Sequence, residues 1–193
     1  MKKDVILAGV GGQGILTISA IIGLAAVNAG LYVKQNEIHG MSQRGGDVHS
    51  NLRLSDQEIA SDLIPAGKAD IIISVEPMEC LRYLPMLSSE GWLITSTDPF
   101  INIPNYPPIE DILSEISKVR HHIMLDADKI AKEIGYIKAA NMVILGAASP
   151  FLDMVYASLE DAIREFFNYK GSDVIDINLQ ALKTGRDFTI SHS

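Results

Sequence analysis

The stretch that decides the fold is DVILAGVGGQGILTISAIIGLAAVNAG, residues 4–30. Residues 5–8 are apolar without interruption, as expected of a strand that is buried on both faces of a parallel sheet. From Ile15 the pattern changes to that of an apolar helix, and Gly30 stands where a helix commonly ends. We therefore predict that the chain begins with a strand, a glycine turn and a helix.

The turn between this strand and this helix has the form G-x-G-x-x-G. It is given by Gly9, Gly11 and Gly14, with Gly12 as an additional glycine and Gln13 before the last. Glycines allow a tight turn and let backbone N–H groups approach a ligand, while a helix N-terminus attracts negative charge. The turn is a candidate phosphate site. The alternative is that its glycines only make a close connection between strand and helix.

The residues after the second expected strand argue against an ordinary dinucleotide site. Such a site has an Asp or Glu at the end of the second strand, about 20 residues after the glycines, to bind the ribose. We expect this strand at residues 31–35, where Gln35 and Asn36 occupy its end and Glu37 lies just beyond. Ordinary NAD binding is therefore not expected.

Length and composition limit the class of protein. With 193 residues, 47% of them hydrophobic, the chain can bury one core, so we expect a single domain over residues 1–193. A net charge of −8 argues against nucleic acid or an anionic membrane as the main partner. Cys80 is the only cysteine, which excludes an intrachain disulfide and an iron–sulfur cluster held by this chain alone.

Neither a metal site nor a catalytic residue is predicted. His39 and His49 have no third ligand at a metal-like spacing, and Ser42 lies outside any G-x-S-x-G context. The apolar stretch at residues 15–27 is too short to cross a bilayer. We expect a cytoplasmic protein.

The rest of the chain alternates between strand and helix patterns. Strands are expected at residues 48–54, 71–75, 92–95 and 123–125, and helices at residues 77–87, 109–119, 127–134, 139–148 and 159–169, with one more left open at 173–184. This alternation predicts an α/β fold: a Rossmann-like, mostly parallel sheet with helices on both faces and helical C-terminal segments. Residues 48–54 alternate apolar and polar, which indicates an antiparallel or edge strand.

A second unusual stretch, EIHGMSQRGG at residues 37–46, follows the second expected strand. Adjacent glycines permit sharp turns, and Arg44 can act as a fork for an anion or a carboxylate. The ordinary alternative is a surface loop with an Arg–Glu ion pair. In a doubly wound sheet this stretch would emerge beside the glycine turn and form one anionic pocket or subunit-contact surface with it. The candidate site residues are Gly9, Gly11, Gly12, Gln13, Gly14, Glu37, His39, Met41, Ser42, Gln43, Arg44, Gly45 and Gly46.

The order of these motifs resembles a known family. G-V-G-G-Q-G after the first strand, then E-x-H-G-M-S-Q-R-G-G and V-H-S-N-L-R-L, is similar to the gamma domain of 2-oxoacid (pyruvate or ketoisovalerate) ferredoxin oxidoreductases. The M-S-Q-R-G-G variant most resembles the small (beta) subunit of indolepyruvate:ferredoxin oxidoreductase. The resemblance is strong in motif order over roughly residues 4–150 and loose over the C-terminal helices.

The resemblance implies a subunit that is inactive alone. The family decarboxylates 2-oxoacids oxidatively on thiamine diphosphate, passes electrons through [4Fe–4S] clusters to ferredoxin and forms an acyl-CoA. In its aryl-pyruvate members a larger alpha subunit carries the thiamine site, with its magnesium, and the cluster cysteines. We thus expect no cofactor on this chain alone. Whether the glycine turn meets coenzyme A, another phosphate or only the neighbouring subunit stays open.

Two other functions are compatible with the residues. The first is a stand-alone Rossmann nucleotide-binding enzyme of the dehydrogenase or adenylating type, which would keep the phosphate turn. The second is a non-enzymatic scaffold domain in which the glycines make only a turn. Binding of NAD, FAD or ATP by the isolated chain would favour the first of these.

Overall fold

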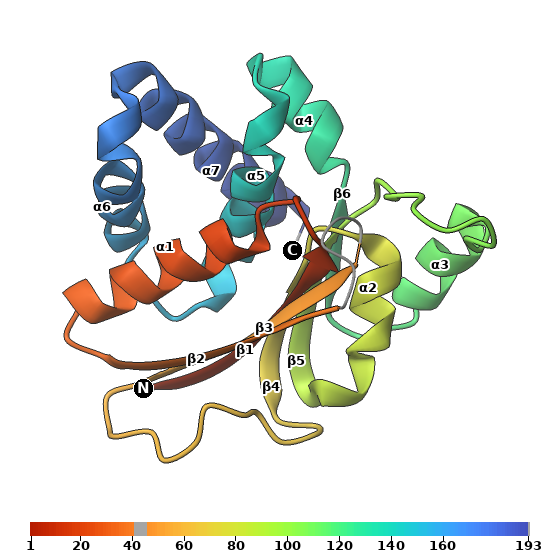
Figure 1. Ribbon diagram of the computed structural model, residues 1–193, viewed down its shortest axis with the longest axis horizontal. Helices are drawn as coiled ribbons and strands as arrows, with labels where there is room; N and C mark the ends of the chain where they lie inside the picture. The colour runs from red at the N-terminus through yellow and green to blue at the C-terminus, as the bar shows by residue number, and fades with distance from the viewer. Residues whose placement is uncertain (41–45, 193) are drawn as a thin grey trace.

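The computed structural model describes residues 1–40 and 46–192, which form a six-stranded sheet in the order β2-β3-β1-β4-β5-β6 (Figure 1). The strands are β1 Lys2–Val10, β2 Tyr32–His39, β3 Asp47–Ser55, β4 Ala69–Ser74, β5 Leu87–Ser96 and β6 His122–Leu125. The helices are α1 Ile15–Asn28, α2 Pro77–Arg82, α3 Ile109–Ile116, α4 Ala127–Ile134, α5 Ala140–Ala148, α6 Tyr156–Phe167 and α7 Ser172–His192. The predicted α/β class is confirmed.

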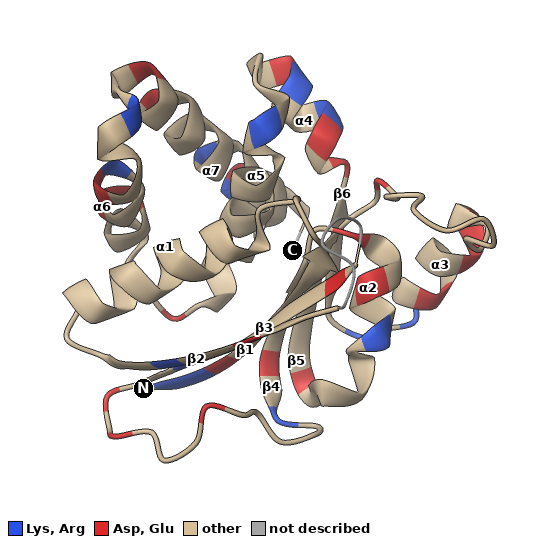
Figure 2. Cartoon of the chain, in the orientation of Figure 1, with Lys and Arg blue, Asp and Glu red and all other residues tan. Residues whose placement is uncertain are grey.

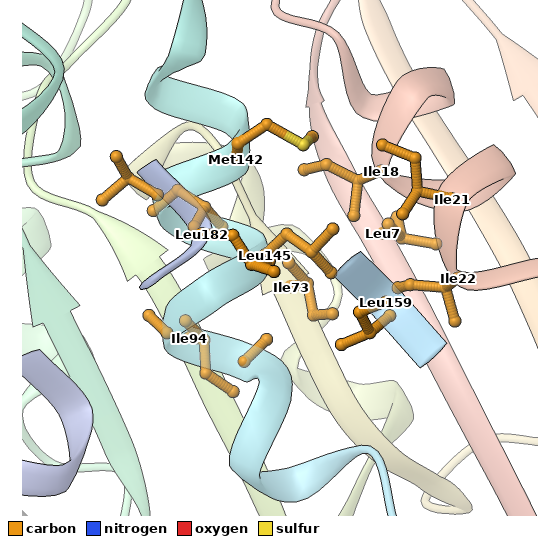
Figure 3. Close-up of a cluster of buried hydrophobic side chains, with 14 of the residues drawn as sticks. Leu7, Ile18, Ile21, Ile22, Ile73, Ile94, Met142, Leu145, Leu159 and Leu182 are labelled. Carbon is orange, nitrogen blue, oxygen red and sulfur yellow. The ribbon is translucent and has the colours of Figure 1, made fainter. Parts of the chain in front are cut away.

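The sheet separates two hydrophobic clusters. One lies under α1, α5, α6 and α7 and includes Leu7 and Ile73 from the sheet, and the other lies under α2 and α3 and includes Ile6 and Ile72 (Figure 1). Successive residues of β1 and β4 therefore enter opposite clusters, because side chains alternate across a strand. Figure 3 shows the larger cluster, where side chains from α1, α5, α6 and α7 meet those from the central strands. The prediction of a first strand buried on both faces is confirmed.

The part of the sheet formed by β1, β4, β5 and β6 is parallel. β1 pairs with β4, β4 with β5 and β5 with β6 in parallel register, which gives the predicted mostly parallel sheet. The β1 and α1 unit also follows the prediction, since the strand ends at Val10 and the helix begins at Ile15. The carboxyl ends of these strands lie at one edge of the sheet, and the glycine turn stands at that edge.

The strand beside β1 departs from a doubly wound sheet. β3 is antiparallel to both β1 and β2, as its alternation predicts, but it is an interior strand, and β2 forms the edge. Since two antiparallel pairings separate β2 from β1, the two strands run in the same direction. β2 therefore still ends at the edge that carries the glycine turn, although by another topology than we expected.

Several element boundaries differ from the prediction, and β5 begins at Leu87, five residues before the expected start. β2 extends to His39, so Glu37 and His39 lie in a strand and not in a loop. α2 ends at Arg82, and a 3₁₀ turn over Leu84–Met86 leads directly into β5, because Pro85 cannot continue an α-helix. α7 begins near the expected position but continues to His192, eight residues beyond the range left open in the sequence.

Helices α5 and α7 cross at two glycines that the sequence analysis did not single out. A Cβ atom at Gly146 would lie 2.0 Å from the Leu182 carbonyl oxygen, and one at Gly185 would lie 1.9 Å from the Val143 carbonyl oxygen. Such distances are far below van der Waals contact, so only glycine permits this approach. The crossing holds α7 closely against α5, which itself packs on β4 and β5.

Candidate functional site

The glycine turn is closed by a side chain of its own. The Gln13 side-chain oxygen accepts the Val10 N–H at 2.8 Å, and the Gln13 N–H donates to the Val10 carbonyl at 3.1 Å. The Gln13 amide also reaches the Val75 carbonyl at the end of β4, at 3.5 Å. Gln13 therefore fixes the shape of the turn, and its predicted part in ligand binding stays a prediction.

The glycines of the turn have different surroundings. A Cβ at Gly9 would lie 2.5 Å from Val75 Cγ2, and one at Gly14 would lie 2.4 Å from Asn141 Nδ2, so both positions are filled by neighbouring side chains. Gly12 has a φ of +103°, and nothing lies within 4 Å of where its Cβ would be. Close packing explains why positions 9 and 14 are occupied by glycine. Gly12 leaves backbone open to a ligand.

The two motifs meet through the backbone. The Gly11 N–H donates to the Gly46 carbonyl at 2.9 Å, and the Gly40 N–H donates to the Asp47 carbonyl at 2.7 Å. The end of the second motif therefore lies beside the glycine turn, in agreement with the expected proximity, and Gly40 is joined to the residue that follows this end. Gly11 uses its N–H in this contact and does not offer it to a ligand. Part of the second motif lies outside the described residues, and its site assignment stays a prediction: Met41, Ser42, Gln43, Arg44 and Gly45.

The remaining residues of the second motif lie at the exposed end of β2. His39 Nε2 lies 3.6 Å from a Glu37 carboxylate oxygen, and the Gln35 amide donates to the other Glu37 oxygen. His39 and Gly40 also border a cavity of about 660 Å³ together with the glycine turn. The side chains of this cavity are mostly apolar, with His39 as the polar exception among the described residues.

A second cavity, of about 590 Å³, opens on the other side of the glycine turn. It is bordered by the turn and the start of α1, by the end of β5, and by the segments around α4, α5 and α7. Its polar side chains are of the kind that bind phosphate and ribose, and its apolar ones include three aromatic rings. The residues that line it include Thr17, Phe100, Asp128, Tyr136, Lys138, Asn141, Phe167, Lys170 and Asn178.

This second cavity carries positive charge in a negatively charged chain. Lys138 and Lys170 line it, and Asp128 is the one acidic residue among its described lining residues. Helix α1 points its N-terminus at the cavity and carries no charged residue (Figure 2). The positive end of its dipole is therefore not neutralised by an acidic side chain in the first turn, which favours an anion there.

Sequence reasoning missed most of this second cavity. Its lysines and asparagines come from residues 138–178, more than 120 positions after the glycine turn, and no local motif marks them. Asn141 is joined to the turn directly, since its side-chain amide donates to the Gly14 carbonyl at 3.3 Å. These residues come together only because α5 packs against α1 and α7 packs against α5.

An acidic pair lies near this cavity, where β5 and β6 end. The Asp98 carboxylate accepts the Asp128 N–H at 3.3 Å, and Asp126 caps α4 by accepting the Lys129 N–H at 2.8 Å. Burial and the neighbouring Asp126 raise the pKa of Asp98 to about 6. Asp98 therefore changes charge in the range in which cells operate.

A further titratable cluster anchors the end of the second motif. The Tyr83 hydroxyl donates to Asp47 at 2.8 Å and lies 2.7 Å from His49 Nδ1, and Arg82 pairs with Glu79 at 2.8 Å. Burial lowers the pKa of His49 and raises that of Glu79, whose carboxylate also lies close to Asp47. The residue at the end of α2 thus holds Asp47, the first residue of β3, which follows Gly46.

Other candidate residues are quickly placed. Cys80 is fully buried, and burial raises the pKa of its thiol to about 12, so it acts as a small apolar residue and not as a nucleophile. Among residues 1–40 and 46–192, no group of three or more His, Cys, Asp or Glu side chains could hold a metal ion. No helix in the same residues is long and apolar enough to cross a membrane.

Comparison with curated proteins gives matches over the whole chain. Indolepyruvate oxidoreductase subunit IorB of Archaeoglobus fulgidus is 38% identical, with 99% of this chain and 97% of the relative covered. IorB of Methanothermobacter thermautotrophicus is also 38% identical, with 96% of each chain covered. 2-Oxoglutarate synthase subunit KorC of Methanothermobacter marburgensis is 30% identical over 97% of this chain and 96% of the relative.

Solved structures share the fold. Pyruvate oxidoreductase subunit PORC from Thermotoga maritima matches with a TM-score of 0.73 at 22% identity and covers 96% of both chains. A 2-oxoglutarate:ferredoxin oxidoreductase from Magnetococcus marinus, solved with 2-oxoglutarate, coenzyme A and succinyl-CoA, matches with a TM-score of 0.80 at 20% identity. It covers 98% of this chain, which spans 31% of that longer polypeptide.

The family model called pyruvate ferredoxin/flavodoxin oxidoreductase matches residues 4–188. The matched range contains both motifs, all of the sheet except the first two residues of β1, and most of α7. It also contains the helices that line the 590 Å³ cavity. The resemblance drawn from the motifs is confirmed, and the chain belongs to the pyruvate ferredoxin/flavodoxin oxidoreductase family.

Proposed function

We propose that this chain is the smaller subunit of a heteromeric 2-oxoacid:ferredoxin oxidoreductase whose substrate is an aryl pyruvate, with indolepyruvate as the best candidate. The observation that carries the proposal is the match to four IorB subunits at 34–38% identity over 96–99% of the chain. The KorC subunits, named for 2-oxoglutarate, are less similar, at 29–30% identity. The whole chain, residues 1–193, then acts as one gamma-type domain.

The chemistry of the reaction takes place on the partner. We infer a larger alpha subunit that carries thiamine diphosphate, magnesium and the [4Fe–4S] clusters, with ferredoxin as electron acceptor in the cytoplasm. The inference is consistent with Cys80 as the only cysteine, because a cluster needs several thiolates. Thiamine diphosphate supplies the decarboxylation, and this chain contributes binding and orientation.

The part of this chain in the reaction is proposed to be coenzyme A binding in the 590 Å³ cavity. Coenzyme A carries phosphates at one end and a planar adenine. Lys138, Lys170 and the N-terminus of α1 attract the phosphates, while Asn141 and Asn178 can hydrogen-bond to the sugar or base. Held at this end, the thiol arm is free to extend toward the partner subunit, where the acyl group is formed.

The first experiment tests the complex. This chain and a candidate alpha subunit, a cysteine-rich thiamine enzyme from the same organism, would be produced together and purified through a tag on this chain. We expect co-purification, iron in the complex, and ferredoxin reduction that needs both indolepyruvate and coenzyme A. Oxidation of an oxoacid by this chain alone, or tight binding of NAD, FAD or ATP to it, would contradict the proposal and favour a stand-alone nucleotide enzyme.

The second experiment tests the cavity. Replacing Lys138 and Lys170 together by Ala should raise the KM for coenzyme A by about tenfold or more, because two charge contacts to phosphate are lost, and should leave the KM for indolepyruvate unchanged. Lys118→Ala is the matched control, since Lys118 pairs with Glu115 on the exposed side of α3. Equal changes in the KM for coenzyme A in the double variant and in the control variant would show that the cavity does not bind coenzyme A.

The second motif needs its own variant. We expect Arg44→Ala to lower the activity of the assembled complex, or to weaken its assembly, without unfolding this chain. Melting temperature and complex activity should be measured on the same protein. A loss of stability on the order of 3 kcal/mol or more in the isolated subunit would instead indicate a buried charge pair, and Arg44 would leave the list of site residues.

A further inference from the structure

The segment between β5 and α3, residues 97–108, presents apolar side chains at the edge of the 590 Å³ cavity. Phe100, Ile101 and Ile103 are 43%, 72% and 37% exposed, and Phe100 is one of the residues that line the cavity. A solvated loop with four prolines does not need such side chains. The proposed function does not use this segment.

The segment is held by a buried carboxylate. Glu76, at the end of β4, is 0% exposed, and its Oε2 accepts the Glu79 N–H at 2.8 Å, as the N-cap of α2. Its Oε1 accepts the Phe100 N–H at 3.2 Å and the Tyr106 hydroxyl proton. Both ends of the segment's apolar part are therefore attached to one carboxylate group.

Capping does not explain why a glutamate is buried here. Among the described residues, no Lys or Arg forms an ion pair with Glu76, and burying a charge without a cation is costly unless hydrogen bonds replace its hydration. A Ser or Asp at the N-cap would satisfy α2 with one oxygen. The second oxygen has only the segment as its partner, which makes the attachment of Phe100 and Tyr106 the added role of the longer side chain.

The segment is also fixed at its start. The Thr97 N–H donates to the Leu125 carbonyl at 3.0 Å, and the Asp98 carboxylate accepts the Asp128 N–H at 3.3 Å. Asp128 itself lines the cavity. The segment therefore runs from the α4 side of the cavity to α2, with Phe100 held between the two attachments.

We propose that Glu76 and Tyr106 are positioning residues that fix Phe100 as an aromatic wall of the 590 Å³ cavity and thereby set its affinity for coenzyme A. The inference rests on the proposed function for the identity of the ligand. An aromatic ring face held in place offers stacking to a planar base, and holding it in advance removes the entropy cost of ordering it on binding. Glu76 and Tyr106 do not touch the ligand and act only through Phe100.

The test uses Tyr106→Phe, which removes one hydroxyl and keeps the ring. In the assembled complex we expect the Kd of coenzyme A, measured by calorimetry, to rise about fivefold, as for the loss of one hydrogen bond. The KM for coenzyme A should rise equally while kcat and the KM for indolepyruvate stay constant. Amide hydrogen exchange should become faster at residues 99–108 and remain unchanged elsewhere.

Two further variants make the result specific. Tyr156→Phe is the matched control, because it removes a buried tyrosine hydroxyl that has no hydrogen-bond partner among the described residues. It should change neither the Kd nor the exchange of residues 99–108. Phe100→Ala should raise the Kd by itself, and adding Tyr106→Phe to it should have no further effect, because both act through the same ring.

The outcomes separate the inference from the proposed function. An unchanged Kd with faster exchange, or additive effects of the two variants, would overturn the positioning role. A wild-type complex that binds no coenzyme A would overturn it as well. A complex that binds coenzyme A, and whose variants behave as expected, but that does not oxidise an oxoacid would support the inference and overturn only the proposed function.

Discussion

The glycine turn at residues 9–14 and the crossing of α5 and α7 both depend on glycine, but for different reasons. At the crossing, the place of each missing Cβ is taken by a carbonyl group of the other helix, at 2.0 Å for Gly146 and 1.9 Å for Gly185. At the turn, side chains fill the space beside Gly9 and Gly14, while the space beside Gly12 is open. The glycines of the crossing permit the approach of two helices, whereas the turn combines glycines that packing requires with one that borders open space.

This difference shows why a glycine motif by itself says little about binding. Of Gly9, Gly12 and Gly14, only Gly12 has open space where its Cβ would be, and it borders both cavities. The other two are required by packing. Counting the glycines in a turn therefore overestimates how many of them can contact a ligand. Whether the space beside a glycine is filled or open distinguishes a packing role from a possible binding role.

The largest expected effect is at the crossing. Gly185→Ala places a methyl group against the Val143 backbone, and because a helix backbone cannot move locally, we expect a loss of about 3 kcal/mol or more in the free energy of unfolding. Urea unfolding measures it. Gly23→Ala in α1 is the control, since its Cβ would meet only Val33 at 3.8 Å; it should be neutral or stabilise by up to about 1 kcal/mol. Similar results for both would show that the crossing is not tight.

An intermediate effect is expected at Gly9. Its Cβ would meet the side chains of Val75 and Ile15 at 2.5 and 2.8 Å, which can shift further than backbone, so Gly9→Ala should cost about 2 kcal/mol. Shortening Val75 to Ala removes the closest atom. The double variant should therefore be less destabilised than the sum of the two single variants in urea unfolding. Strict additivity would contradict the proposed packing role.

A smaller loss of stability is expected at Gly12, with a larger effect on binding. Gly12→Ala meets no atom, but an alanine at a φ of +103° is strained by about 1 to 2 kcal/mol. Coenzyme A binding should weaken by about tenfold or more, because the methyl group faces the cavity. Gly30→Ala is the matched control, with a φ of +77° and nothing within 4 Å at the other end of α1. Equal binding in both variants would remove Gly12 from the site.

The smallest effect concerns pH at the edge of the cavity. Because the pKa of Asp98 is raised to about 6 in the folded protein, the folded state binds its proton more tightly than the unfolded state. Its contribution favours folding below about pH 4 and is lost as the pH rises through 6. Asp98→Asn should therefore stabilise the protein at pH 8 by roughly 1 kcal/mol, after allowance for solvent screening, with little change at pH 4.

Thermal unfolding of Asp98→Asn at several pH values checks this prediction. Asp161→Asn on α6, an exposed partner of Arg164, serves as the control and should leave the pH dependence unchanged. A stability difference between Asp98→Asn and the wild type that is independent of pH would show that the carboxylates of Asp98 and Asp126 do not interact. The comparison of the two glycine regions would be unaffected.

The sequence alone determined the elements whose patterns are local. An uninterrupted apolar run gave β1, an apolar helix after glycine gave α1, and Asp126 before an amphipathic pattern gave α4 with its boundaries at Ala127 and Ile134. The same kind of local evidence, two motifs in a fixed order, was enough for the family. Each of these depends on residues that are close in the chain, where propensity and periodicity act directly.

Tertiary structure alone decided the position of β3, the α5–α7 crossing and the second cavity. Whether a strand pairs at an edge or inside a sheet depends on partners that its own residues do not specify. In the sequence, Gly146 and Gly185 are only residues of low helix propensity. Their role in close packing is visible only where α5 and α7 cross. Lys138, Lys170 and Phe100 line one cavity with the glycine turn only because distant segments pack together. Sequence patterns record what a residue prefers locally, and contacts between distant segments decide what it does.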